Sequence, residues 1–216
     1  PNVSTMAPRP FRCVVHGPVV TLLFGSAATQ HAALSRLECF YESEKHANVY
    51  LTREEAARER ICKGYEAFNL PLDVVPRWLQ AMHDAEKPEP SDEQPWWHAY
   101  CTPEEASVLK ALDELDTKPT YLVSALAQHA DVALAHERLH ALYHLSAPYR
   151  AMLATLWDGM PRNVQSAVQY DLQMRGYREA VWQDELGAYL GIRVAPTSRR
   201  GDPSLEFGNK CAEVCR

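Results

Sequence analysis

From Asp131 to Gly191 the sequence carries four consecutive helix patterns, and this run constrains the fold more than any other feature. Asp131 precedes the apolar stretch VALAHERLHALYHL, in the position of a helix cap. Ser146 and a proline in the first turn open SAPYRAMLATLW, Asn163 opens NVQSAVQYDLQM, and REAVWQDELGAYLG ends at Gly191. We therefore expect helices to dominate the C-terminal half of the chain.

The N-terminal part differs, because its apolar segments are short and rich in β-branched residues. Residues 11–24 predict a strand or a hairpin, and residues 48–52 and 119–126 predict further short strands. Helices with a capping box, in which Thr is followed three residues later by Glu, are expected after Thr52 and Thr102. A few strands followed by helices predict an α+β fold, with a small N-terminal sheet and a helical C-terminal half.

Length and composition favour a single domain over residues 1–216, because 216 residues, 46% of them hydrophobic, suffice for one well-buried core. Residues 86–95 contain three prolines and four acidic residues, so we expect a mobile acidic Pro-rich loop. Residues 196–216 are rich in turn formers and charge, and we expect a loosely structured tail.

Charge and cysteine content limit the partners. The net charge of −6 and the pI of about 5.9 argue against nucleic acid, since its binders usually present a basic face. No apolar run approaches the roughly 20 residues that span a bilayer, so no membrane partner is expected. Six cysteines without a CxxC pair favour free thiols and a cytoplasmic location, with secretion as the alternative if a leader has been removed. The oligomeric state stays open.

The stretch ALAHERLHALYHL, residues 133–145, contains the spacing His-Glu-x-x-His at His136, Glu137 and His140. In a helix, residues four apart stack one turn above another, so both imidazoles can bind one ion, and zinc accepts neutral imidazole nitrogen. Glu137 projects beside them and can reach a metal-bound water. His144 continues the row, but it lies about 12 Å from His136 along the axis, too far to bind the same ion. Because the helix is apolar nearly all round, we expect it to be buried.

A catalytic zinc usually takes three protein ligands, and Glu185 is the candidate for the third. On a helical wheel it lies inside an apolar stripe, whereas Asp184 lies toward the edge and Glu179 faces away. The stripe consists of Val181, Trp182, Ala188 and Tyr189. A buried carboxylate needs a partner, because an unpaired charge is costly there. A metal ion would be such a partner, and an ion pair with Arg138 or Arg175 is the alternative.

HERLH on one helix with DELGAYL on a later one resembles the gluzincin branch of zinc metallopeptidases. In that family the two motif histidines and a distant glutamate bind zinc, and the motif glutamate activates the water. The resemblance covers roughly residues 119–191, in which PTYLVSAL corresponds to a strand of the family's sheet. It implies Zn²⁺ as the cofactor, a zincin-like active-site helix, His136, His140 and Glu185 as ligands, and Glu137 as the general base.

An oxyanion must also be stabilised, and Tyr189, Tyr143 and His144 are candidates because they can donate hydrogen bonds. Packing within the core is the alternative role for each. The sequence therefore predicts a zinc-dependent hydrolase that acts on a peptide or small amide substrate, with Glu137, Tyr189 and His144 as catalytic residues. Two alternatives stay open. One is a non-proteolytic metalloenzyme, such as a lyase or a biosynthetic tailoring enzyme, and the other is a non-catalytic protein with a chance HExxH.

Overall fold

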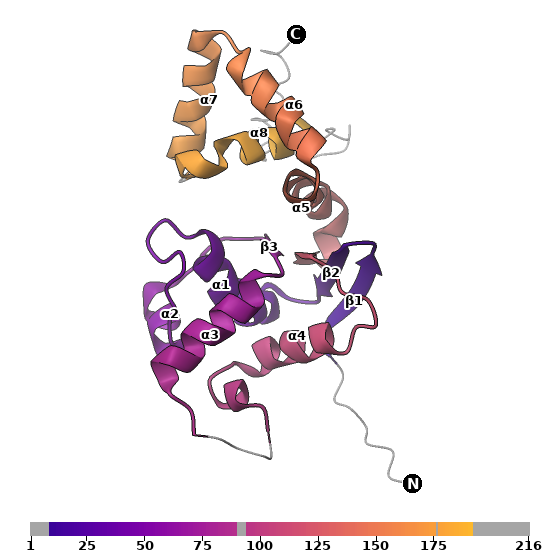
Figure 1. Ribbon diagram of the computed structural model, residues 1–216, viewed down its shortest axis with the longest axis vertical. Helices are drawn as coiled ribbons and strands as arrows, with labels where there is room; N and C mark the ends of the chain where they lie inside the picture. Colours follow the sequence, from indigo (N-terminus) through magenta and orange to yellow (C-terminus); the bar gives the residue numbers. More distant parts are fainter. Residues whose placement is uncertain (1–8, 90–93, 176, 192–216) are drawn as a thin grey trace. The chain divides into compact units, whose positions relative to one another are not determined.

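The computed structural model describes residues 9–89, 94–175 and 177–191, and it confirms the α+β fold class (Figure 1). Contacts divide the chain into two compact units, residues 1–130 and 131–216, which are described separately below. The expectation of a single domain stays a prediction. The predicted tail at 196–216 and residues 90–93 of the predicted acidic loop lie outside the described residues.

A four-stranded sheet organises the first unit, in the order β1-β2-β4-β3. Its strands are β1 (Phe11–His16), β2 (Val19–Phe24), β3 (Ala67–Pro71) and β4 (Tyr121–Leu126). Gly17 has a φ of +54° in the turn between β1 and β2, which confirms the hairpin. β2 pairs with β4 in parallel, and β3 pairs with β4 antiparallel.

The expected strand at 48–52 is wrong, and β3 takes the fourth place in the sheet. The backbone carbonyl of Leu51 accepts a hydrogen bond from Arg36 Nη1 at 3.0 Å. That carbonyl is therefore used by a guanidinium instead of a neighbouring strand, and the segment stays irregular.

The described part of the first unit also contains four α-helices and two 3₁₀ turns. They are α1 (Ala27–Glu42), α2 (Arg53–Glu59), α3 (Val74–Glu86), η1 (Trp96–Ala99), α4 (Pro103–Asp113) and η2 (Ala127–His129). Both predicted capping boxes are confirmed, at Thr52 and Thr102. The glutamate of the second box, Glu105, also accepts a hydrogen bond from Arg36 Nε at 2.8 Å in the core. This buried ion pair joins α1 to α4, and several donors and acceptors on each side satisfy it.

The second unit is helical throughout its described part. It contains α5 (Ala130–Leu145), α6 (Ala147–Asp158), α7 (Arg162–Met174), the 3₁₀ turn η3 (Glu179–Val181) and α8 (Trp182–Gly191). The start of α5 differs slightly from expectation, because the helix follows directly from η2 and Asp131 lies in its first turn. Ser146 caps α6 as predicted, with its Oγ accepting from the Tyr149 amide. In Figure 1, α6 and α7 form two sides of a triangle that α8 closes.

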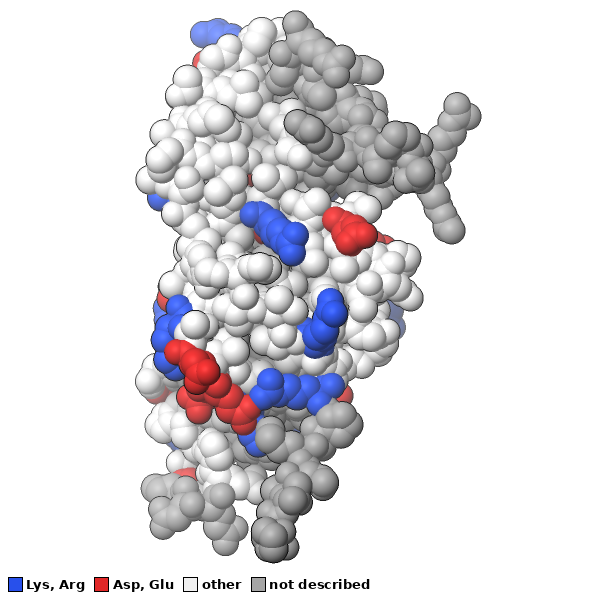
Figure 2. All heavy atoms as spheres, turned by 90° about the vertical axis from the view of Figure 1, so that its right-hand side faces the viewer, with Lys and Arg blue, Asp and Glu red and all other residues white. Residues whose placement is uncertain are grey.

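Three observations bear on the expectations drawn from the cysteine content, the hydropathy and the charge of the sequence. Cys13, Cys39, Cys62 and Cys101 are free, as expected, and the other two cysteines lie outside the described residues. Within the described ranges, no helix is both long and apolar enough to span a bilayer. On the face drawn in Figure 2, the described Lys and Arg side chains lie singly or beside Asp and Glu.

Candidate metal centre

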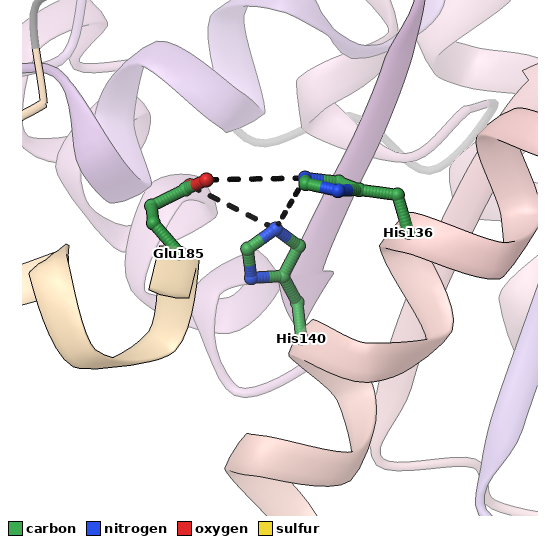
Figure 3. Close-up of side chains that lie close together, drawn as sticks. All are labelled: His136, His140 and Glu185. Carbon is green, nitrogen blue, oxygen red and sulfur yellow. Dashed lines mark hydrogen bonds and ion pairs between the residues drawn. The ribbon is translucent and has the colours of Figure 1, made fainter. Parts of the chain in front are cut away.

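Helices α5 and α8 bring three potential ligands together, as Figure 3 shows. His136 and His140 project from successive turns of α5, and their Nε2 atoms lie 3.1 Å apart. Glu185 projects toward both from α8. Its Oε2 lies 3.8 Å from His136 Nε2, and its Oε1 lies 3.7 Å from His140 Nε2. The three residues predicted from the sequence as metal ligands are therefore neighbours, although 45 residues separate His140 from Glu185.

The donor atoms lie near enough to one another to hold one small divalent ion. With zinc bonds of about 2.0–2.1 Å, the edges of a tetrahedron of ligands are about 3.3 Å long. The imidazole nitrogens are 3.1 Å apart, and different oxygens of Glu185 lie 3.8 Å from His136 and 3.7 Å from His140. With one donor atom taken from each residue, all three lie within 4.8 Å of one another. Two imidazole nitrogens and a carboxylate oxygen are also a ligand set found in catalytic zinc sites. The residues of this cluster thus fit a zinc ion in chemistry, and their donor atoms are close enough to share one ion.

Burial of the cluster agrees with the wheel position of Glu185. His140 is 4% exposed, Glu185 5% and Glu137 8%. The alternative explanation for Glu185 was an ion pair with an arginine. Glu185 forms ion pairs with the two imidazoles, Arg175 Nε contacts Asp171 at 2.7 Å, and Arg138 is exposed.

The expectation that α5 is buried all round is wrong. Val132, at 51%, and Leu142, at 42%, are exposed. The residues of α5 that are buried are Leu134, Glu137, His140 and Ala141. On a wheel they span an arc centred near Glu137, roughly opposite the apolar arc that contains Val132 and Leu142. The buried face of α5 is therefore centred on the motif itself.

Asp184 contacts the cluster from outside, and the sequence analysis missed this role. Its Oδ1 lies 2.9 Å from Nδ1 of His140, the ring nitrogen opposite the one that faces Glu185. A carboxylate on the far nitrogen of a metal-binding histidine fixes the ring's tautomer and orientation. On the helical wheel Asp184 lies at the edge of the apolar stripe. This position was the one indication in the sequence that Asp184 could contact His140. A residue there can reach the side of an imidazole that is itself buried.

Protonation of the two histidines differs in the absence of a metal. Burial and the nearby His140 lower the pKa of His136 to about 3. Burial also opposes the charged form of His140. It is outweighed by the carboxylates of Asp184, Glu185 and Glu137, which raise the pKa of His140 to about 10. In the metal-free protein His136 is thus neutral, and His140 carries the additional proton. A metal ion must displace it to use Nε2.

Tyr189 is the candidate oxyanion donor that lies beside the cluster. Its ring is 5.0 Å from the ring of His136, centroid to centroid, and its hydroxyl lies 3.3 Å from that of Tyr177. The guanidinium carbon of Arg175 lies 5.4 Å from the centroid of the Tyr189 ring. Tyr189 is buried, so its contacts serve packing as well as any chemistry.

The other two candidate donors lie nearer the end of α5. The side chain of His144 is exposed, and its backbone carbonyl accepts a hydrogen bond from Arg150 Nη1 at 2.5 Å. The same nitrogen donates to the carbonyl of Tyr143 at 2.7 Å, so Arg150 satisfies two carbonyls at the C-terminus of the helix. The catalytic roles assigned to His144 and Tyr189 stay predictions.

Comparison with known proteins adds no relative: the chain matches no family model, and no curated protein and no solved structure matches it. The case for a function therefore depends on the geometry of this cluster.

Proposed function

We propose that this protein is a zinc-dependent hydrolase that cleaves a peptide or small amide bond, with His136, His140 and Glu185 as zinc ligands. The observation that carries the proposal is the convergence of these three side chains, from helices far apart in the sequence, at ligand spacing. The gluzincin-like order of the motif, HERLH followed by DELGAYL, points to the same chemistry.

Each residue around the site has a distinct task in this proposal. Bound zinc supplies a water of lowered pKa and polarises a carbonyl oxygen. Glu137 accepts a proton from the water at its carboxylate and passes it on to the leaving nitrogen. Asp184 holds the Nδ1 side of His140, so that Nε2 stays directed at Glu185. Tyr189, packed on His136, is the hydrogen-bond donor we favour for the developing oxyanion.

Metal content is the first test. Purified protein should bind one zinc per chain, measured by elemental analysis and by calorimetric titration of the chelator-treated protein. His136→Ala and Glu185→Ala should each lose that zinc, because each removes one of three ligands. Glu179→Ala is the matched control, since Glu179 is exposed on the turn η3 that precedes α8. Zinc binding that survives both ligand substitutions would reject the site.

Turnover is the second test, and Glu137→Gln is the variant that separates metal binding from catalysis. The amide has nearly the same shape as the carboxylate but accepts no proton, so this variant should keep zinc and lose hydrolysis. A library of short peptides and amides, assayed with the zinc-loaded chain, gives the substrate profile. A chain that binds zinc but cleaves none of them would favour the non-proteolytic metalloenzyme over the hydrolase.

A further inference from the structure

Helix α5 leaves several of its large apolar side chains exposed. One core cluster is formed by residues of α6, α7 and α8 alone: Trp157, Val168, Leu172, Leu186 and Tyr189. Of the apolar side chains of α5, Leu134 and Ala141 are buried, whereas Val132, Leu142 and Leu145 are exposed. The hydrophobic effect therefore holds this helix less firmly than its composition suggests.

The histidine motif provides several contacts between the described parts of α5 and α8. His136 pairs with Glu185, and His140 pairs with both Glu185 and Asp184. The His136 ring also packs on Tyr189, and the tip of Leu139 lies where a Cβ on Gly191 would be, within 2.5 Å of it. The ligands of the proposed metal are thus among the side chains that join the two helices.

Acidic side chains gather at this junction. Three carboxylates, Glu137, Asp184 and Glu185, act on His140, and two of the three are buried. Glu185 also lies 3.8 Å from His136. Like charges held close together in a medium of low dielectric constant repel, and desolvation adds to the cost. A divalent cation bound between the helices offsets this repulsion, and it replaces separate ion pairs by coordination bonds to one centre.

We propose that binding of a divalent transition-metal ion such as Zn²⁺ docks α5 onto α8, so that the metal is a structural clasp of the helical unit. The proposal rests on the metal site of the proposed function and adds a conformational role to it. Without metal, α5 and α8 open more often than with it and exchange their amide hydrogens through that opening. With metal, the opening requires release of the ion.

Hydrogen exchange of the full chain, measured by mass spectrometry with and without zinc, tests this directly. If opening releases the ion, exchange slows by a factor of one plus the free zinc concentration over its Kd. At free zinc 100 times the Kd we expect about 100-fold slower exchange in peptides from 130–145 and 182–191. Peptides from α1 and α4 serve as the internal reference and should be unchanged.

Variants and titrations separate the possible failures. Glu185→Gln should abolish the zinc-induced protection, whereas Glu179→Gln, altered in the preceding turn, should retain it. If calorimetry records stoichiometric zinc binding but exchange in α5 and α8 is the same in both forms, the clasp is refuted and the proposed function stands. If the wild-type chain binds no zinc, both proposals are refuted. The comparison of the wild-type chain with and without zinc requires no variant to fold.

Discussion

Replacing Asp184 by alanine removes the carboxylate that lies 2.9 Å from Nδ1 of His140. Groups that orient a metal-binding histidine are worth about 10–100-fold in metal affinity. The Asp184 side chain carries a charge and can accept a hydrogen bond. Asp184→Ala should therefore lower the zinc affinity by about 100-fold, the upper end of that range, or about 2.8 kcal/mol. Asp184→Asn keeps an acceptor oxygen and loses only the charge, so we expect about 10-fold. Loss of the direct ligand in Glu185→Ala should exceed both.

Competition for zinc against a chromophoric chelator at neutral pH measures these affinities. Asp171→Asn is the control, because Asp171 is a carboxylate of the same unit whose partner is Arg175 and not a histidine. Far-UV circular dichroism establishes that each variant is folded. The helical wheel alone predicts that Asp184→Ala binds zinc like the wild type. A zinc affinity within twofold of wild type in this variant would agree with the wheel and refute the orienting role.

Three further predictions concern stability. Glu105→Ala leaves the Arg36 guanidinium buried without its carboxylate, so urea denaturation should record a loss of about 3–5 kcal/mol; a loss below 1 kcal/mol would contradict this. Gly187→Ala places a Cβ 2.3 Å from a buried leucine side chain of α6. Overpacking costs about 1–3 kcal/mol, and the higher helix propensity of alanine offsets part of this cost. We therefore expect the free energy of unfolding to fall by about 1 kcal/mol, whereas a stabilised variant would show that the leucine moves aside. In the metal-free protein the pKa of His140 is raised to about 10. In the unfolded chain the pKa of His140 is about 6.5, so protonation of His140 stabilises the folded state. This contribution to the free energy of unfolding is complete below about pH 6.5 and is lost as the pH rises through 10. The urea midpoint of chelator-treated protein should therefore fall across that range, and a flat profile would contradict the raised pKa.

Local signals in the sequence predicted local structure well. The capping boxes at Thr52 and Thr102 and the cap at Ser146 each depend on residues within one turn, and all three are present. The hairpin depends on Gly17, whose left-handed φ lets the chain reverse. Where a residue's conformation is set by its near neighbours, the sequence is sufficient to predict it.

Elements whose stability comes from distant partners were harder to predict. No element was assigned to residues 27–42, which form α1, because polar residues interrupt its apolar pattern. Two of these are buried through partners far along the chain: Gln30 donates to Ser124 Oγ at 2.9 Å, and Arg36 binds Glu105. β3 was missed for a similar reason, since its pairing partner is β4, about 50 residues later. Such partners are visible only once the chain is folded.

The orientation of α5 bears on whether its HExxH is a chance pattern. A helix that served packing alone would turn its apolar arc inward, because full burial of a Val or Leu side chain is worth about 1.5–3 kcal/mol. Here Val132 and Leu142 remain exposed, and the helix buries Glu137 and His140 instead, roughly half a turn away. Burial of charge-capable groups at the expense of aliphatic ones costs stability unless those groups have a partner. Both ring nitrogens of His140 have partners, since Nε2 lies beside Glu185 and Nδ1 beside Asp184. The fold therefore gives up apolar burial to assemble this cluster, which favours a functional origin for the motif over a core helix that contains it by accident.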